Sequence, residues 1–223
     1  MPVILPDLKI AYFALPKAAS TSVKLALWHA LHGEPWTGTT EDIHAQFRIY
    51  PLKPEDSDGL EDYFKFTVIR DPIDRLLSAY HNRVWQHHDL ELRRPKTFMR
   101  KIDWRIRFPW FQPYPNPDDF FTGLSGYQER SYSIWHHTIP ANRFTGPDLG
   151  WFDAVYRIED LAWLEPELAK RSGHEIPLRE RQNSGQGLSF ASLAPETRSF
   201  LRNYTATEYD LVADYYNPPP PTD

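Results

Sequence analysis

The 223-residue sequence contains no cysteine, which excludes disulfide bonds and any zinc or iron–sulfur site with cysteine ligands. The lack of disulfides fits a reducing compartment. The first residues, MPVILPD, include no basic residue and no long apolar segment, so we expect no secretory signal peptide. No uninterrupted apolar run approaches the roughly 20 residues that span a bilayer. Together these absences predict a soluble, cytoplasmic protein without a transmembrane segment.

The sequence also lacks an overall excess of positive charge. Its formal net charge is -5, which argues against a general nucleic-acid-binding protein. The positive charge is unevenly distributed, however, because residues 93–107 hold seven Arg or Lys and one Asp. A basic patch on an acidic protein indicates an anionic partner at that place. Its cationic residues are Arg93, Arg94, Lys96, Arg100, Lys101, Arg105 and Arg107.

Length and hydrophobic content fit one domain with a buried core, which we assign to residues 1–216. The proline-rich residues 217–223 are expected to form a disordered tail. Strands are predicted at 9–15, 65–69 and 154–158, and each is followed by a helical pattern, which predicts an α/β fold with a largely parallel sheet. The expected helices are 20–32, 73–88, 97–107, 118–124, 126–137, 159–171, 195–203 and 206–216, whereas residues 34–62 are expected to be mostly irregular.

The first strand leads into a turn, residues 16–22 (PKAASTS), with the composition of an anion site. Ala18 and Ala19 are small enough for the backbone to approach a phosphate, and Lys17 adds a positive charge. The helix that follows supplies unpaired N–H groups and the positive end of a dipole. The turn is neither a Walker A motif nor a dinucleotide-binding G-x-G-x-x-G motif. The alternative is an ordinary helix capped by Ser20 or Thr21 with Lys17 on the surface.

The second turn lies in residues 66–80 (FTVIRDPIDRLLSAY). Arg70 ends a strand, and Pro72 suits the first turn of the next helix. Arg70 offers a forked, permanently charged donor for phosphate, and Ser78 lies eight residues later. Arg75 is expected to form a surface ion pair with Asp71 or Asp74. Two such turns suggest a ligand that carries two separated anionic groups.

Together the two segments resemble those of the sulfotransferases that use 3′-phosphoadenylyl sulfate (PAPS), and most closely the carbohydrate branch of that family. A shorter likeness at residues 44–47 (HAQF) matches an H-x-x-F element of the family, and weaker ones occur at 152–161 and 176–184. The resemblance implies a P-loop-NTPase-like three-layer fold with a central, mostly parallel sheet. The missing cysteines and membrane stem differ from Golgi members and suggest a soluble, bacterial-type version.

The resemblance implies transfer of a sulfuryl group from PAPS to a hydroxyl, with a carbohydrate as the favoured acceptor, adenosine 3′,5′-bisphosphate as the other product and no metal. In this reading Lys17 neutralises charge on the leaving phosphate oxygen. The phosphosulfate is held by Lys17, Ala18, Ala19, Ser20, Thr21 and Ser22, and the 3′-phosphate by Arg70 and Ser78.

His44 is the first choice for the general base that takes the proton of the acceptor, because the matching family element carries a histidine there. His136 and His137 are the alternatives, and they are also candidate contacts of the acceptor. Arg100, Trp104 and Arg105 are further candidates on the acceptor side. Trp110, Phe111 and Tyr114 are aromatic residues that can stack on sugar rings, and residues 179–187 are candidates for adenine binding.

Two other functions remain open from the sequence. A small-molecule kinase with a P-loop-like fold is disfavoured because the sequence lacks the lysine–serine order of a Walker A motif. It also lacks an obvious magnesium-binding carboxylate. A non-catalytic nucleotide- or glycan-binding protein is disfavoured by the joint presence of Lys17, Arg70 and Ser78, because a binding protein needs no group that stabilises a leaving oxygen.

Overall fold

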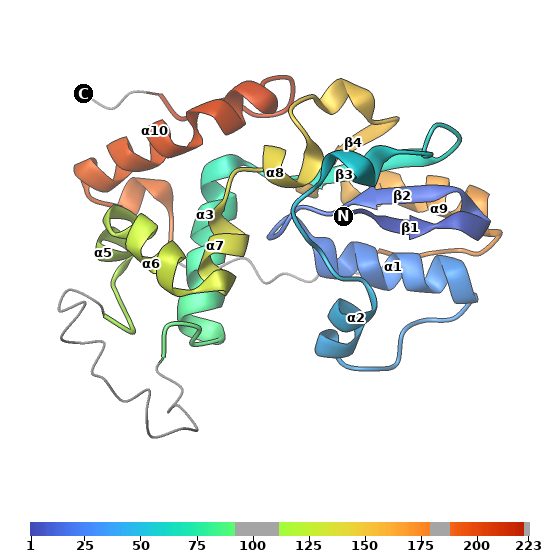
Figure 1. Cartoon of the computed structure of the whole chain (residues 1–223), viewed down its shortest axis with the longest axis horizontal. Helices are drawn as coiled ribbons and strands as arrows, with labels where there is room; N and C mark the ends of the chain where they lie inside the picture. The colour runs from blue at the N-terminus through green and yellow to red at the C-terminus, as the bar shows by residue number, and fades with distance from the viewer. Residues whose placement is uncertain (92–111, 179–187, 221–223) are drawn as a thin grey trace.

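The computed structural model describes residues 1–91, 112–178 and 188–220 (Figure 1). A four-stranded sheet lies at its centre in the order β1-β2-β3-β4. β1 pairs antiparallel with β2, whereas β2, β3 and β4 are parallel to one another. The prediction of an α/β fold with a mostly parallel sheet flanked by helices is therefore confirmed. The strands are β1 (Val3–Leu5), β2 (Ile10–Phe13), β3 (Phe64–Ile69) and β4 (Ala154–Arg157).

The two central strands are built almost entirely from apolar residues because both of their faces are covered. All four residues of β2 are buried, and only Lys65 of β3 is not. Thr67, the buried polar residue of β3, donates a hydrogen bond from its hydroxyl to the carbonyl of Phe13 at 2.7 Å. That bond satisfies the hydroxyl, which would otherwise be costly to bury. Register follows from the same pairing, with Phe13 beside Thr67 and Val68 beside Tyr156.

One face of the sheet packs against helices that lie below and behind it in Figure 1. Alternate side chains of the strands, such as Tyr12, Phe66 and Val68, point into this layer. Burying each large apolar side chain contributes about 1.5–3 kcal/mol. The elements of this layer are α1 (Ser20–His32), α2 (Thr40–Gln46), the 3₁₀ helix η6 (Ile158–Leu164) and α9 (Glu165–Ser172).

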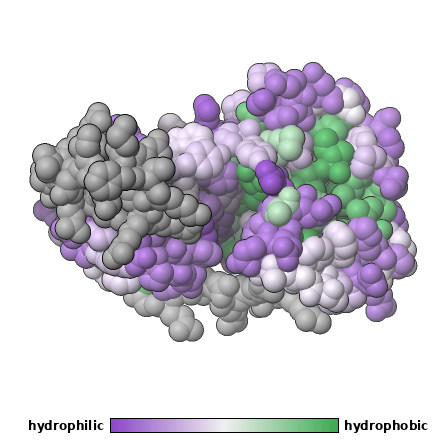
Figure 2. Space-filling view, turned by 60° about the horizontal axis from the view of Figure 1, so that its bottom comes forward, coloured by the Kyte–Doolittle hydropathy of each residue, from purple (hydrophilic) through white to green (hydrophobic). Residues whose placement is uncertain are grey.

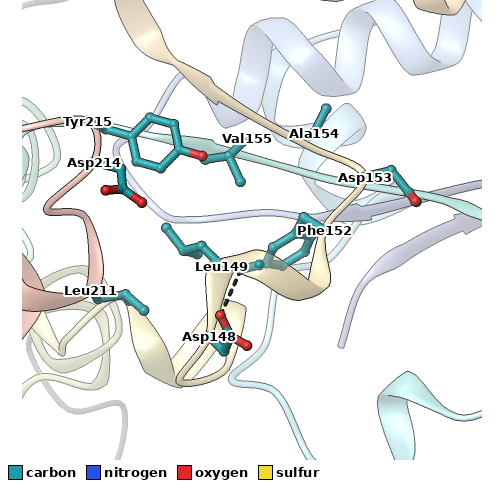
Figure 3. Close-up of a pocket in the computed structure, with 10 residues that line it drawn as sticks. Asp148, Leu149, Phe152, Asp153, Ala154, Val155, Leu211, Asp214 and Tyr215 are labelled. Atoms are coloured by element: carbon teal, nitrogen blue, oxygen red, sulfur yellow. Dashed lines mark hydrogen bonds between the residues drawn. The ribbon is translucent and has the colours of Figure 1, made fainter.

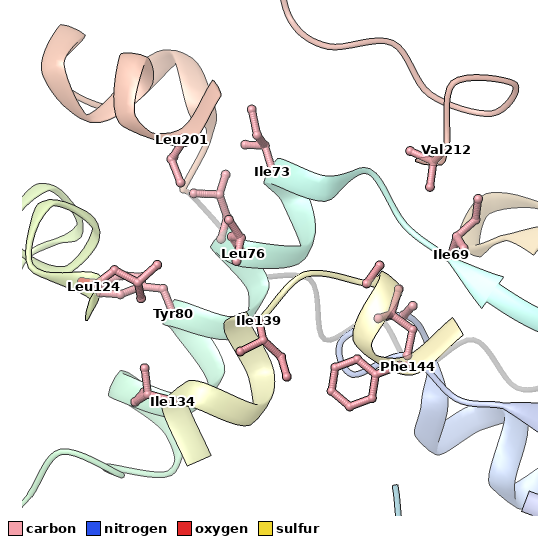
Figure 4. Close-up of a cluster of buried hydrophobic side chains, with 14 of the residues drawn as sticks. Ile69, Ile73, Leu76, Tyr80, Leu124, Ile134, Ile139, Phe144, Leu201 and Val212 are labelled. Carbon is pink, nitrogen blue, oxygen red and sulfur yellow. The ribbon is translucent and has the colours of Figure 1, made fainter. Parts of the chain in front are cut away.

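The other face packs against a larger helical layer. The apolar side chains of Ile73, Leu76 and Tyr80 from α3 meet Ile134, Ile139 and Leu201 in one cluster (Figure 4). Three layers result, as the resemblance implied. The layer comprises α3 (Pro72–Tyr80), the π-helix η3 (His81–Gln86), α5 (Pro117–Thr122), α6 (Leu124–Arg130), α7 (Tyr132–Thr138), α8 (Asn142–Thr145) and α10 (Pro195–Leu211). Short 3₁₀ helices η1 (Pro6–Leu8), η2 (Pro54–Ser57), η5 (Leu149–Trp151) and η7 (Phe190–Ser192) connect the elements.

Several predicted elements differ from the observed ones. The segment expected to be irregular contains α2, whose start is fixed by a capping box between Thr39 and Asp42. Residues 195–203 and 206–216 belong largely to one helix, α10, because no glycine or proline interrupts them. The helix expected at 126–137 is two helices, and Ser131 caps the second by accepting from the N–H of Ile134. The helix expected at 159–171 begins as the 3₁₀ helix η6.

Arg75 was expected on the surface and is instead completely buried. Its guanidinium donates to both carboxylate oxygens of Glu208 in α10 at 2.8 Å. It also donates to the carbonyls of His137 and Ile139, and Glu208 accepts from the N–H of Ala141 at 3.2 Å. The ion pair thus joins α3, α10 and the connection between α7 and α8. The expectation failed because the partner lies 133 residues away in sequence.

The face of the molecule shown in Figure 2 is mostly hydrophilic at its edges, with apolar side chains exposed between hydrophilic ones. Among the described residues, the most exposed large apolar side chain is that of Trp163, at 75%. None of the helices in the described ranges combines the length and the apolar character needed to cross a membrane.

Candidate active site

The two turns singled out in the sequence meet at one edge of the sheet. β2 and β3 are adjacent and parallel, so the residues after Phe13 and after Ile69 emerge at neighbouring carboxyl ends. The turns also touch directly, because Nη1 of Arg70 donates to the carbonyl of Lys17 at 3.4 Å. The structure therefore brings Lys17 and Arg70 into one site.

The backbone of the first turn has the shape of an anion cradle. Lys17 and Ala19 have positive φ angles of 68° and 52°, on either side of Ala18. Ala19 is left-handed (φ 52°, ψ 20°) and is followed by the right-handed residues of α1, and such a pair points successive N–H groups to one side and forms a concave anion-binding nest. A non-glycine residue at positive φ costs free energy, and such strain is concentrated at functional sites.

The start of α1 leaves its donors directed toward this nest. Neither Ser20 nor Thr21 is the N-cap, as the alternative interpretation required, because the helix is preceded by Ala19 and no described side chain caps it. Val23 donates to the carbonyl of Ala19 at 3.1 Å, so the N–H groups of Ser20, Thr21 and Ser22 precede the first intrahelical bond. An oxyanion in the nest can accept hydrogen bonds from these groups.

Lys17 carries an amine whose charge is unusually sensitive to its surroundings. Burial is the main cause that lowers the pKa of Lys17 to about 7, and the positive charges of Arg83 and Arg70 lower it further. Three cationic side chains are thus close enough to repel one another. An anionic group bound among them removes this repulsion and favours the charged form of the lysine.

The second turn is rigidly built. Asp71 caps α3 by accepting from the N–H groups of Ile73 and Asp74 at 3.0 Å, and the hydroxyl of Tyr209 donates to its other oxygen at 2.9 Å. Pro72 occupies the first turn of α3, as predicted. Ser78 lies about two turns further along and is only 6% exposed. The carboxylate of Asp71 therefore stabilises the start of α3. The side chain of Arg70 points toward the first turn.

His44 lies in α2 and contacts the first turn through α1. Its Nε2 atom is 3.1 Å from the hydroxyl of Thr21, and its Nδ1 atom is 2.9 Å from the amine of Lys24. Burial is the largest cause that lowers the pKa of His44 to about 4, followed by the positive charges of Lys24 and Arg83. The imidazole is therefore neutral at physiological pH.

His136 and His137 occupy the last turn of α7 and belong to the same electrostatic neighbourhood. Burial, then the charges of Lys24 and Arg83, lower the pKa of His136 to about 4. Burial and Arg83 also hold the pKa of His137 well below its usual value. Nδ1 of His137 lies 2.8 Å from the carbonyl of Ser133, which leaves Nε2 as the free acceptor in the tautomer that donates this bond.

Arg83 is a site residue that the sequence analysis missed. Its charge acts on the pKa values of Lys17, His44, His136 and His137, so it is central to the cluster. It forms an ion pair with Asp89 at 3.3 Å. Arg83 lies in the π-helix η3, where His87 donates to the carbonyl of Asn82 five residues earlier. π-turns within helices are frequent at functional sites, but no simple sequence pattern predicts them.

Some of the candidate acceptor contacts lie outside the described residues. These are Arg100, Trp104 and Arg105, together with Arg93, Arg94, Lys96, Lys101, Arg107, Trp110, Phe111 and the helix expected at 97–107. The loop proposed for adenine binding, 179–187, lies outside them as well. Tyr114 is described, and its ring lies 5.8 Å from that of Trp85 and 5.6 Å from that of His88. Tyr114 and Trp85 are both partly exposed.

A cavity of about 280 Å³ lies between the start of β4 and the end of α10 (Figure 3). Ala154, the first residue of β4, lines it together with Phe152 and Tyr215. Asp153 at its edge accepts from the N–H of Lys65 at 2.7 Å, near the amino end of β3. The cavity contains none of the predicted site residues. In the described parts of the chain, no group of three or more His, Cys, Asp or Glu side chains is arranged to hold a metal ion.

Comparison with known proteins agrees with this arrangement. Residues 2–198 match the family described as the sulfotransferase family, so the chain belongs to that family. Human carbohydrate sulfotransferase 9 is 22% identical over 232 residues, which cover 93% of this chain and 49% of the relative. The chain thus spans about half the length of the curated relative it matches. No solved structure matches the chain significantly.

The match corrects one prediction. A cytoplasmic protein of bacterial type was expected because the sequence lacks cysteine and a membrane stem. That expectation is wrong, because the matching relative is a human carbohydrate sulfotransferase. The chain corresponds to about half of that relative, so its amino-acid composition does not indicate its cellular location. The resemblance to the carbohydrate branch of the family is confirmed.

Proposed function

We propose that this protein transfers a sulfuryl group from PAPS to a hydroxyl group of a carbohydrate. The observation that carries the proposal is the direct contact of the two turns, in which Arg70 donates to the carbonyl of Lys17 beside the nest. This arrangement fits a donor with a 5′-phosphosulfate and a separate 3′-phosphate. The carbohydrate acceptor is supported by the name of the human relative.

The residues of the first turn hold the reacting end of the donor. The N–H of Ala18 donates to the carbonyl of Leu15, so the N–H groups of residues 19–22 and the hydroxyls of Ser20, Thr21 and Ser22 bind the phosphosulfate oxygens. Lys17 stabilises the negative charge that develops on the leaving phosphate oxygen. Sulfuryl transfer resembles phosphoryl transfer with a loose transition state, so positioning and charge stabilisation supply most of the catalysis.

Arg70 and Ser78 bind the 3′-phosphate, which distinguishes PAPS from ATP. His44 takes the proton of the acceptor hydroxyl, a role supported by its contact with Thr21 of the first turn. His136 and His137 line the acceptor side, where their neutral imidazoles can hydrogen-bond to sugar hydroxyls. The proposal requires no metal.

Calorimetry with adenosine 3′,5′-bisphosphate, ADP and ATP, each with and without magnesium, tests the donor. We expect binding of the 3′,5′-bisphosphate that is tighter than that of ADP and unchanged by magnesium. Arg70 provides the recognition, so the Arg70→Ala variant is expected to lose this preference. Magnesium-dependent binding of ATP without binding of the bisphosphate indicates a kinase and rejects the proposal.

The affinity for the bisphosphate is expected to fall as the pH rises from about 6.5 to 8.5. In the free protein the pKa of Lys17 is about 7, and a bound 5′-phosphate favours its charged form, so its pKa rises on binding. The complex therefore takes up a proton when it forms above pH 7. A rise of about one pKa unit limits the loss of affinity to about tenfold. The ligand itself titrates near pH 6, below this window.

Proton uptake is measured by calorimetry at pH 8 in two buffers that differ in ionisation enthalpy. A difference in the observed binding enthalpy reports the uptake, and the Lys17→Met variant is the control that removes it. Equal enthalpies in both buffers for the unmodified protein contradict contact between Lys17 and the 5′-phosphate.

A further inference from the structure

Lys24 in α1 is a buried lysine without a carboxylate partner among the described residues, which is an unfavourable environment for a charged amine. Its side chain is only 1% exposed, although lysine is almost never fully buried without a charged partner. In the part of the chain that the structure describes, no carboxylate forms an ion pair with it. The polar contact of its amine is with Nδ1 of His44 at 2.9 Å. Burial alone lowers the pKa of Lys24 to about 8.

The charge of Lys24 determines which nitrogen of His44 carries the proton. A charged lysine has only donors, so Nδ1 must accept from it, and the neutral imidazole then carries its proton on Nε2 and donates to Thr21. A neutral lysine has a lone pair and can accept from Nδ1–H. In that state Nε2 holds a lone pair and accepts from the hydroxyl of Thr21. Only this second tautomer makes Nε2 a base.

The surroundings of His44 oppose a lasting positive charge on its ring. Lys24 of α1, Lys17 of the first turn and Arg83 of η3 are positive, and among the described residues that act on it Glu41 of α2 is negative. His136 of α7, which also senses Lys24, is neutral. A proton taken up at Nε2 is therefore poorly held unless the ring releases its other proton.

We propose that Lys24 is a positioning residue that sets the tautomer of His44 and receives its proton during sulfuryl transfer. The inference rests on the proposed function. As the bond between sulfur and the acceptor oxygen forms, the bond between sulfur and the phosphate oxygen breaks and leaves its electron pair on that phosphate oxygen. With substrates bound, the hydroxyl of Thr21 donates to the phosphosulfate, and the acceptor hydroxyl takes its place at Nε2 of His44. The acceptor proton then moves to Nε2, and the Nδ1 proton moves to the amine of Lys24. The lysine begins the step neutral and ends it as an ammonium.

Nitrogen-15 NMR of the histidine rings tests the coupling without donor or acceptor. Between pH 6 and 10 we expect His44 to change from the Nε2–H to the Nδ1–H tautomer, with a midpoint near the pKa of Lys24, about 8. The Lys24→Gln variant, whose amide oxygen can only accept from Nδ1–H when it faces the ring, is expected to show the Nδ1–H tautomer at every pH. A single unchanging tautomer in the unmodified protein overturns the proposal whether or not the variants fold.

The dependence of kcat on pH tests the relay in catalysis. We expect kcat of the unmodified protein to rise about tenfold per pH unit below pH 8 and then level off. Lys24→Gln is expected to lower kcat at least tenfold and to remove this slope, because its amide cannot receive a proton. Lys24→Arg stays charged at all these pH values and is expected to be the least active variant. Lys170→Met on the exposed end of α9 is the control with unchanged kcat.

The two measurements separate the possible failures. Sulfuryl transfer with an unchanging His44 tautomer, or with a slope retained in Lys24→Gln, overturns the relay and leaves the proposed function standing. Absence of sulfuryl transfer from PAPS to any carbohydrate overturns both, even where the NMR midpoint is found.

Discussion

Replacing Lys17 with alanine is expected to lower kcat by about 10²–10³-fold and to weaken binding of adenosine 3′,5′-bisphosphate by no more than about tenfold. The amine stabilises charge that is largest in the transition state, whereas the bisphosphate carries that charge only partly. The lysine is also surrounded by Arg70 and Arg83, which retain most of the positive potential for a bound phosphate. Kinetics at saturating PAPS, together with calorimetry of the bisphosphate, measure the two effects separately.

Two variants control this experiment. Lys17→Gly removes the amine and also relieves the backbone at φ 68°, so it is expected to be as inactive as Lys17→Ala but more stable by about 1 kcal/mol. Arg70→Ala is expected to show the opposite pattern, with affinity for the bisphosphate reduced by about 10–100-fold through loss of a charged hydrogen bond. Equal effects of the Lys17 and Arg70 variants on binding and turnover contradict the division of roles.

Replacing Arg75 with methionine is expected to destabilise the fold by about 3–5 kcal/mol, because the carboxylate of Glu208 is left buried without a partner. The carbonyls of His137 and Ile139 lose a donor at the same time. For a protein of this size the change lowers the midpoint of thermal unfolding by about 10 °C. Urea unfolding followed by circular dichroism measures the free energy.

The control for this prediction is the exposed ion pair of Arg157 with Asp160, whose side chains are 41% and 40% exposed. Arg157→Met is expected to cost far less stability than Arg75→Met, because solvent screens an exposed ion pair. The double variant Arg75→Met, Glu208→Met is expected to be more stable than the sum of its single variants, since it leaves no unpaired charge. A cost below about 1 kcal/mol for Arg75→Met contradicts the structural role assigned to the pair.

The three parallel strands and both turns were predictable because their signals are local, whereas the short antiparallel strand β1 was not predicted. Aromatic and β-branched runs mark β2 and β3, and Pro72 marks the start of α3. The helix α2 was predictable in principle from Thr39 and Asp42, whose spacing is that of a capping box. The same holds for Lys24, which interrupts an otherwise buried apolar face of α1.

Other features depend on contacts that no local pattern contains. The positive φ of Lys17 belongs to a turn shape that lysine itself does not favour, so only the surrounding structure explains it. The buried ion pair of Arg75 joins it to Glu208, which lies 133 residues later in the sequence. The neutral state of His44 results from burial and from charges on three separate elements. These long-range effects decide the chemistry of the site.

The π-turn at the end of α3 has a consequence for comparing related sequences. Within η3 the chain uses about one more residue per turn than an α-helix does. Each residue of an α-helix advances by about 100°, so a relative without this turn presents a different face from the position after it onward. Alignment with such a relative therefore requires a one-residue gap within His81–Gln86, and the counterpart of a residue beyond the gap lies one position away from its ungapped match.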